Sequence, residues 1–247
     1  MKSLLARLPD DPAAPFPPPH TALKRPEGLL AWGGDLSPTR LANAYRSGVF
    51  PWYSEGDPLL WWSPDPRTVF DVDALHLTRR FRRWLRGCGW TLHADRDFDA
   101  VLKACATIPR RGQSGTWILP EMIEAYTALH RLGIAHSIEV YDETGGLVGG
   151  IYGVAVPGVF CGESMFSHAS GGSKVAIAAL CRLLRERGVM LLDAQLHNPH
   201  LESLGARPMP RAAYLEHLAR GGPDLTGQNW RAWLDGAPAS ALADFAA

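Results

Sequence analysis

The chain has 247 residues, and its 25 Lys and Arg balance its 25 Asp and Glu to a formal net charge of zero. This length allows one or two domains with a sizeable core, and the zero net charge excludes a protein that coats nucleic acid by bulk charge. Hydrophobic residues make up 46% and charged residues 20%, which excludes a disordered chain, and no apolar run approaches the roughly 20 residues of a membrane span.

The beginning of the chain predicts an extended lead-in. Arg7 and Pro9 interrupt the first apolar stretch too early for a secretory signal peptide. Residues 9–26 contain seven prolines, which favour extended polyproline-type backbone over helix or central strand.

A helix follows in the segment GLLAWGGDLSPTRLANAYRSGVFPW. Asp35 or Ser37 can cap it, Pro38 suits its first turn, and Gly48 suits its end. The aromatic, proline-rich segment PLLWWSPDPR comes next. We therefore place a domain junction near residues 64–67.

Residues 75–86 predict a short helix with two different sides. The apolar side holds Leu77, Phe81, Trp84 and Leu85, and the opposite side holds Arg79, Arg82, Arg83 and Arg86. No acidic residue between Ala74 and Ala94 neutralises these arginines. The pattern favours binding of nucleic-acid phosphates over the alternative of a merely solvated face.

The second half of the chain predicts an α+β domain with a mostly antiparallel sheet flanked by helices. A helix from Pro120 to Gly133 precedes a three-strand meander at 135–141, 147–155 and 159–166. A glycine-rich turn, a helix ending at Gly188, a buried strand at 189–195 and two short helices follow. This order is similar to the acetyltransferase-like (GNAT) fold. We expect a small N-terminal domain at 1–66, a GNAT-like domain at 67–220 and a loosely ordered tail at 221–247.

Three short segments hold the candidate reactive groups. Asp193 and Gln195 end the buried strand, where a carboxylate is costly unless it is paired or used. Glu163 ends the third meander strand, and alternation places it on the face opposite Ser164. Asn198 begins the third segment. For Asp193, a helix cap or a buried salt bridge remains an open alternative.

No metal or disulfide is expected. His197 and His200 are three residues apart, but no third ligand is evident. None of the four cysteines stands in a C-x-x-C pair, which indicates reduced thiols in a cytoplasmic protein.

Tryptophans in glycine- and proline-rich segments are candidate stacking surfaces. They are Trp32, Trp52, Trp61, Trp62 and Trp117. Exposed aromatics beside arginine suit a single-stranded nucleic-acid end, whose bases stack while arginine holds the phosphates. For each of them, ordinary packing is the alternative.

Several long motifs together resemble the leucyl/phenylalanyl-tRNA–protein transferase family. They are GLLAWGGDLSPTRLANAYRSGVFPW, LWWSPDPR, SGTWI, HSIEV, LVGGIYGV, FCGESMFS, LLDAQ and HLESLGA, in this order. The resemblance covers about residues 16–220. Ala194, Gly172 and Trp32 depart from the usual residues of the family, but none of these departures removes a polar group assigned above.

The resemblance implies a cytoplasmic bacterial enzyme that uses neither metal nor cofactor. It transfers leucine or phenylalanine, and methionine less well, from aminoacyl-tRNA to an N-terminal Arg or Lys of an acceptor protein. The new peptide bond creates an N-terminal degradation signal. Asp193, Gln195, Glu163 and Asn198 match the family's catalytic positions. We expect Asp193 to orient the acceptor amine, and two routes for its proton stay open: the Asp193 carboxylate or the terminal ribose hydroxyl of the tRNA.

The resemblance also implies the binding residues. The aminoacyl pocket comprises Ile151, Phe160, Met165, Ile177, Leu180 and Leu192. Trp52 and Trp117 match aromatics near the terminal adenosine of the tRNA. Arg79, Arg82, Arg83 and Arg86 match a basic helix that holds the acceptor stem.

Two other functions remain open from the sequence. A CoA-dependent N-acyltransferase shares the fold, but its pyrophosphate loop matches His168-Ala169-Ser170-Gly171-Gly172-Ser173 poorly. A non-catalytic module that binds an RNA end or a peptide is the other alternative. This alternative predicts that the protein has no transfer activity, so that Asp193→Ala leaves the measured activity unchanged.

Overall fold

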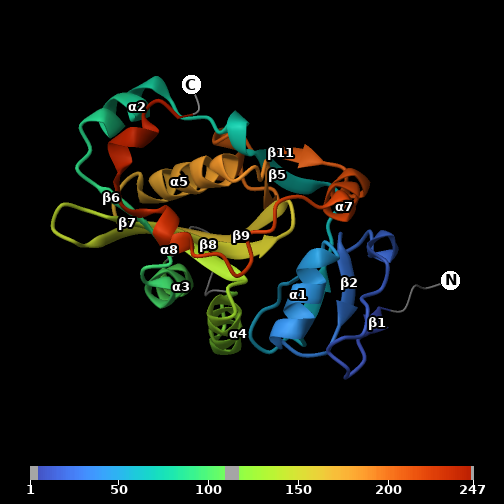
Figure 1. The fold of residues 1–247 in the computed structure, drawn as a ribbon. Helices are drawn as coiled ribbons and strands as arrows, with labels where there is room; N and C mark the ends of the chain where they lie inside the picture. Colours follow the sequence, from blue (N-terminus) through green and yellow to red (C-terminus); the bar gives the residue numbers. More distant parts are fainter. Residues whose placement is uncertain (1–4, 109–116, 246–247) are drawn as a thin grey trace.

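The structure, a computed structural model, describes residues 5–108 and 117–245. These residues form two units, each with its own sheet (Figure 1). In the N-terminal unit the strands lie in the order β1-β2-β4-β3, and helix α1 follows β2 in the chain. The bounds are β1 Ala6–Arg7, β2 Leu29–Trp32, α1 Pro38–Arg46, β3 Phe50–Pro51 and β4 Leu60–Trp62. As predicted, Ser37 caps α1: its hydroxyl accepts the backbone N–H of Arg40 at 3.3 Å.

The second unit has an eight-stranded sheet in the order β11-β5-β10-β9-β8-β7-β6-β12. The strands are β5 Arg67–Asp71, β6 Thr91–Ala94, β7 Ala135–Tyr141, β8 Leu147–Val156, β9 Val159–Ser167, β10 Leu191–Gln195, β11 Arg207–Met209 and β12 Asp235–Pro238. β9 and β10 pair in parallel, and the other neighbours in this sheet pair antiparallel. The α+β class and the meander β7–β9 are confirmed.

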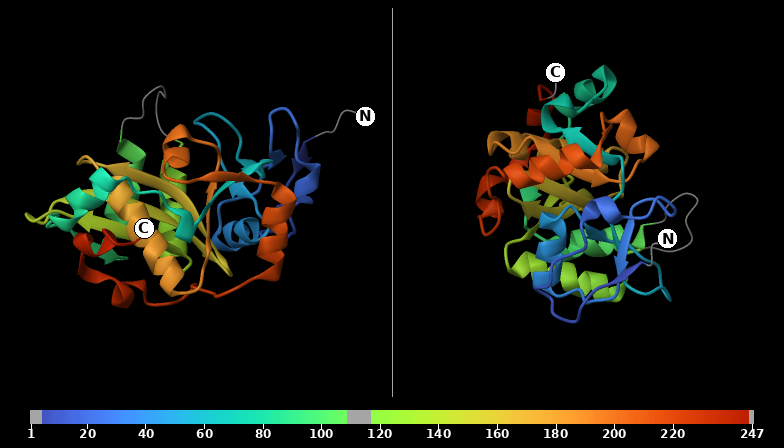
Figure 2. Two further views of the ribbon diagram at one scale, coloured as in Figure 1. Left: turned by 90° about the horizontal axis from the view of Figure 1, so that it is seen from above. Right: turned by 90° about the vertical axis from the view of Figure 1, so that its right-hand side faces the viewer.

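Helices cover both faces of the large sheet. Helix α5 (Gly172–Glu186) crosses one face, and α2 (Arg79–Arg86) lies on the same side (Figure 1). Helices α3 (Phe98–Thr107) and α4 (Pro120–Arg131) lie on the opposite side, together with the N-terminal unit (Figure 2). Helix α5 begins directly against β8, because a Cβ on Gly149 would lie 2.4 Å from the backbone carbonyl carbon of Gly172.

One apolar core joins the N-terminal unit to the large sheet. It contains Tyr45 of α1, Tyr126 of α4 and Tyr152 of β8, all of them buried. The remaining helices are α6 Pro199–Ser203, α7 Arg211–Arg220 and α8 Trp230–Trp233, with short 3-10 helices at Pro19–Thr21, Val72–Ala74 and Ala239–Leu242. Within the described residues, no helix combines the length and the apolar character that crossing a membrane requires.

The C-terminal segment differs from the expectation of a loosely ordered tail. Residues 221–245 follow the sheet edge, where β12 pairs antiparallel with β6. Trp230 and Phe245 are buried in the same core cluster as α5. Glycine, proline and alanine are frequent here, but the burial of these two aromatic side chains favours an ordered segment.

Two further expectations need correction. Helix α2 begins at Arg79 rather than at residue 75, because the Thr78 hydroxyl caps it by accepting the N–H of Phe81 at 3.2 Å. Its predicted apolar side is divided: Leu85 is buried, but 40% of Trp84 is exposed. Helix α3 and the strands β5 and β6 were not expected from the sequence.

Candidate active site

The site forms where the parallel strands β9 and β10 part. They pair over only three residues each, Val159–Cys161 with Leu191–Asp193. Beyond this point each strand carries a bulge: the register shifts around Glu163 in β9 and around Ala194 in β10. A bulge bends its strand, and these two bulges lie just past the last parallel pair, Cys161 with Asp193.

The bulges also change where side chains point. Cys161 and Phe166 belong to one core cluster although regular alternation places residues five apart on opposite faces. The expectation that Glu163 faces away from Ser164 therefore rests on an alternation that the bulge interrupts. Beside it, Gln195 has a φ of +53°, a left-handed conformation that is uncommon for a residue with a side chain.

A cavity of about 540 Å³ lies where β9 and β10 part. Its apolar lining comprises Phe70, Ile151, Met165, Ile177, Leu192, Ala194 and Leu201, and Gly162 also lines it. Its polar lining comprises Glu163, Ser164, Asp193, Gln195, Asn198 and His200. An apolar cavity with a few polar groups in its wall is typical of a small-ligand site.

Asp193 is buried in an ion pair with Arg67. One carboxylate oxygen accepts Arg67 Nε at 2.8 Å and the other accepts Arg67 Nη2 at 2.6 Å. The backbone N–H of Gln195 and the Tyr214 hydroxyl donate to the same carboxylate, each at 2.9 Å. All four contacts are internal and the side chain is fully buried. The salt-bridge alternative is therefore correct for Asp193, and its carboxylate lacks a free lone pair for an incoming amine.

Arg67 was missed by the sequence analysis, although it ends the motif LWWSPDPR. Its guanidinium lies between the rings of Phe50 and Tyr214, at 4.8 and 4.7 Å from the ring centres, and donates to the Gly48 carbonyl at 3.2 Å. Burial lowers the pKa of Arg67, but the charge and hydrogen bonds of Asp193, together with Tyr214 and Cys161, raise it above its usual value. The pair joins the neighbouring strands β5 and β10, and the contacts of Arg67 with Gly48 and Phe50 link it to the N-terminal unit.

Glu163 ends a buried chain of hydroxyl groups. The Tyr126 hydroxyl of α4 donates to Glu163 at 2.9 Å, and the Tyr45 hydroxyl of α1 hydrogen-bonds to Tyr126. Burial raises the pKa of Glu163 to about 7, while the hydroxyls of Tyr126 and Tyr45 lower it. Burial also raises the pKa of Tyr126, so this hydroxyl stays protonated and can donate its hydrogen bond to Glu163.

Gln195 is held at two points. Its backbone N–H donates to Asp193, and its side-chain Nε2 donates to Glu163 at 2.9 Å. The carbonyl oxygen Oε1 is the acceptor of this side chain, and the Nε2 hydrogen bond to Glu163 fixes its orientation for a ligand. The arrangement fixes one acceptor at the cavity wall.

Asn198 and His200 also line the cavity. Asn198 caps α6, because its Oδ1 accepts the backbone N–H of His200 at 2.8 Å, which leaves its Nδ2 as a donor. Partial burial is the main cause that lowers the pKa of His200, and the charge of Lys174 adds to it.

The structure brings most of the expected site residues together. Asp193, Gln195, Glu163 and Asn198 all line the cavity, as do four of the six expected pocket residues, Ile151, Met165, Ile177 and Leu192. Phe160 and Leu180 are at most 1% exposed in the core and do not line it. Phe160 instead packs against Trp230, 5.4 Å away between ring centres.

The expected RNA-binding residues lie outside the cavity lining. Trp52 is 37% exposed and packs edge-on against Trp62, whereas Trp117 is partly buried against the core. Trp61 is fully buried, so packing explains it. On α2, Arg79, Arg83 and Arg86 are exposed and Arg82 is partly buried.

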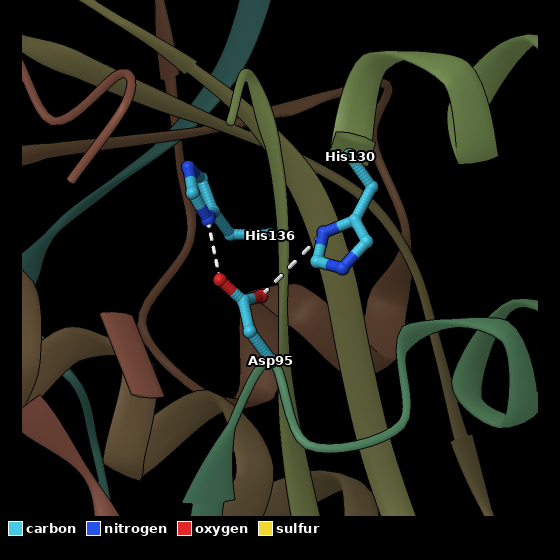
Figure 3. A group of neighbouring side chains, drawn as sticks. All are labelled: Asp95, His130 and His136. Atoms are coloured by element: carbon cyan, nitrogen blue, oxygen red, sulfur yellow. Dashed lines mark hydrogen bonds and ion pairs between the residues drawn. The ribbon is translucent and has the colours of Figure 1, made fainter. Parts of the chain in front are cut away.

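Asp95, His130 and His136 form the group of possible metal ligands found among the described residues (Figure 3). Both ring nitrogens of His136 are already engaged: Nδ1 is 2.7 Å from Asp95 and Nε2 is 3.0 Å from the Gly133 carbonyl. His130 Nδ1 is 2.9 Å from the Ala135 carbonyl. The atoms that would bind a metal are thus hydrogen-bonded, and none of the three residues lines the cavity. We assign this group to the stability of the fold.

Comparison with known proteins gives matches over most of the chain. Residues 69–219 match the model for leucyl/phenylalanyl-tRNA protein transferase, and residues 34–65 match the model for the N-terminal domain of that transferase. A protein of the same description from Xanthomonas campestris pv. campestris strain B100 is 61% identical to this chain. The match covers 86% of this chain and 85% of the relative. One from Xanthomonas axonopodis pv. citri strain 306 is 58% identical and covers 95% of this chain and 94% of the relative.

Two solved structures are more distantly similar. L-PGS from Bacillus licheniformis has a TM-score of 0.38 and 16% identity, covering 64% of this chain and 50% of that one. A tandem GNAT protein from the clavulanic acid biosynthesis pathway has a TM-score of 0.36 and 17% identity, covering 74% of this chain and 58% of that one.

Proposed function

The chain belongs to the leucyl/phenylalanyl-tRNA–protein transferase family, and on this premise we propose that it transfers leucine or phenylalanine, and methionine less well, from aminoacyl-tRNA to an N-terminal Arg or Lys of an acceptor protein. The observation that carries the proposal is the doubly held Gln195 at the wall of an apolar cavity. It offers one fixed acceptor beside a space suited to an apolar side chain.

The reaction needs little from the protein besides positioning. The α-amine of the acceptor attacks the ester carbonyl carbon, the C–N bond forms, and the C–O bond to the tRNA ribose breaks. The nitrogen loses a proton and the ribose oxygen gains one. Because the ester is already activated, no cofactor is required, and holding the neutral amine in line with the carbonyl accounts for much of the rate.

We assign the positioning of the amine to Gln195. Its Oε1 would accept a hydrogen bond from the α-amine, while Glu163 fixes the side chain through Nε2. Asp193 acts one step further away, by holding the backbone N–H of Gln195, with Arg67 holding Asp193. This replaces the expectation that Asp193 itself orients the amine.

The apolar part of the cavity would take the donor side chain. Met165, Ile151 and Ile177 line it, and methionine adapts its shape to different apolar groups. A pocket of this kind can accept both leucine and phenylalanine. An acidic group beside it, Glu163, would favour a cationic acceptor residue such as Arg or Lys.

The RNA would be held outside the cavity. The exposed arginines of α2 suit the phosphates of the acceptor stem, and Trp52 and Trp117 suit the terminal adenosine. Since aminoacyl-tRNA is found in the cytoplasm, we place the reaction there. Its product carries a new N-terminal residue that serves as a degradation signal.

The experiment is transfer of radiolabelled leucine from Leu-tRNA to three versions of one protein, beginning with Arg, Lys or Met. We expect label on the Arg and Lys versions and none on the Met version. Absence of label from all three, with a folded protein that binds tRNA, would favour the non-catalytic binding module. A thermal shift with acetyl-CoA would instead favour the CoA-dependent N-acyltransferase.

A further inference from the structure

Trp84 is an exposed aromatic side chain on the most basic helix of the molecule. Helix α2 reads RRFRRWLR, five arginines in eight residues. Within the part of the chain that the structure describes, Arg86 alone among them has an acidic partner, Asp244 at 3.2 Å, and both members of that pair are exposed. With 40% of its side chain exposed, Trp84 lies among positive charges that the protein leaves largely uncompensated.

Two other aromatic rings fix the position of Trp84. Phe81 stacks on it, with 5.2 Å between ring centres and 27° between planes, and Trp90 packs edge-on at 5.0 Å. A side chain held this way has already lost its rotamer freedom, so a ligand that stacks on it need not order it. Trp84 is therefore a rigid aromatic surface rather than a loosely attached side chain.

This aromatic group lies beside the start of α5. A Cβ on Gly171, the residue before α5, would lie 3.0 Å from Phe81 and 3.9 Å from Trp84. Lys174 in the first turn of α5 places its Nζ 5.8 Å from the centre of the Phe81 ring. One turn further along, Ile177 lines the cavity. The surface made by Phe81, Trp84 and Lys174 thus borders the site through a single turn of helix.

We propose that Trp84 stacks on an unpaired nucleobase of the RNA substrate, next to the terminal nucleotide that enters the site. The inference rests on the proposed function for the identity of the RNA. Single-stranded nucleic acid requires aromatic faces for its bases and cations for its phosphates, and α2 supplies both. A base-paired stem exposes no base face except at its end, so the occupant is an unpaired nucleotide. Five arginines disfavour an apolar protein partner at the same place.

The test is equilibrium binding of tRNA to the full chain and to Trp84→Ala and Trp84→Phe, over a range of salt concentrations. Base stacking contributes about 1–3 kcal/mol, so Trp84→Ala should weaken binding by about 5- to 140-fold. Trp84→Phe should retain most of the affinity, because any aromatic face can stack. The dependence on salt should be the same in all three, since no charge is removed.

Two comparisons decide the interpretation. With tRNA that lacks its unpaired 3′ nucleotides, Trp84→Ala and the unchanged protein should bind alike. Trp233, which is partly buried and packs beneath Arg187 at 4.3 Å, provides the matched control variant Trp233→Ala. Equal binding of intact tRNA by Trp84→Ala and the unchanged protein, or an equal loss with trimmed tRNA, would overturn the inference.

Transfer assays separate this inference from the proposed function. We expect Trp84→Ala to raise the KM for aminoacyl-tRNA and to leave kcat unchanged. If the unchanged protein transfers leucine and Trp84→Ala has the same KM, only the stacking role of Trp84 is wrong. If the unchanged protein transfers nothing, the proposed function itself is wrong.

Discussion

At the scale of single residues, the ion pair of Arg67 and Asp193 stabilises the protein only while both partners are present. Removing one partner leaves the other buried and charged, which typically costs about 3–5 kcal/mol. Asp193→Ala and Arg67→Met should each lower the free energy of unfolding by about this amount in urea denaturation. The double variant should be more stable than either single variant, because no unpaired charge remains. If the loss of unfolding free energy in the double variant equals the sum of the two single losses, Arg67 and Asp193 do not stabilise the protein as a pair.

Glu163 should affect the pH dependence of transfer. Its pKa is raised to about 7, mainly by burial, and its carboxylate accepts the Gln195 amide. As the pH falls below about 7, this carboxyl takes up a proton, and the α-amine, with a pKa of about 7.7–8.0, also stays protonated. The logarithm of kcat/KM for an acceptor peptide should therefore approach a slope of about 2 against pH.

The variant Glu163→Gln isolates the contribution of the carboxyl. The substituted amide can still accept the Gln195 N–H but does not titrate, so the slope below pH 7 should fall to about 1. Measurement of kcat/KM from pH 5.5 to 9 tests this. Identical profiles for the two proteins would show that the ionisation of Glu163 plays no part in transfer.

Glu139 should make stability fall as the pH rises. It is fully buried on β7, and burial raises its pKa to about 7 from 4.5. Between these values the folded state holds a proton that the unfolded chain has released, so stability is lost with increasing pH. Between about pH 4.5 and 7 the free energy of unfolding of Glu139→Gln, relative to that of the unchanged protein, should rise by about 1.4 kcal/mol per pH unit. The total rise should reach about 3 kcal/mol near pH 7. Chemical denaturation at pH 5 and pH 7 measures the change, and a pH-independent difference would contradict it.

At the scale of elements, α2 should contribute the salt dependence of RNA binding. Each phosphate contact contributes about 0.7–0.9 to the slope of log K against log salt. Changing Arg79, Arg82, Arg83 and Arg86 to Gln should lower that slope by about 2–4, the smaller value allowing for the Asp244 partner of Arg86. Arg182→Gln on α5, where Glu186 pairs with the arginine at 2.9 Å, is the control. An unchanged slope in the fourfold variant would remove α2 from the RNA-binding surface.

Periodicity predicted the elements of the site but not their irregularities. The meander, α5 and β10 follow from alternation and from helix-type spacing, and the structure confirms them. Alternation contains no signal for the bulges around Glu163 and Ala194, although these bulges lie where the pairing of β9 with β10 ends. The same limit applies to Trp84, which helical spacing places on the apolar side and which tertiary packing leaves exposed.

At the scale of the whole molecule, the site depends on elements far apart in the sequence. Tyr45 comes from the N-terminal unit, Tyr126 from α4 and Tyr214 from α7, and each hydroxyl belongs to the hydrogen bonds behind Glu163 or Asp193. The motifs indicated that Asp193, Gln195 and Glu163 act together. They did not indicate Arg67 or the tyrosines, because a buried partner on another element leaves no local pattern.

The C-terminal segment completes the large sheet, and Trp230 is its largest buried side chain. This side chain is 1% exposed and stacks on His136 with 4.2 Å between ring centres and 7° between planes. Because Trp230 also packs on Phe160 of β9, the strand that carries Glu163, its loss should be felt near the cavity. Trp230→Ala should lower the free energy of unfolding by about 3–5 kcal/mol and should reduce transfer through the disturbed β9. Trp233→Ala, at the partly exposed end of α8, should cost much less in the same urea titration. Equal stability of Trp230→Ala and the unchanged protein would mean that residues 221–245 are not an integral part of the sheet.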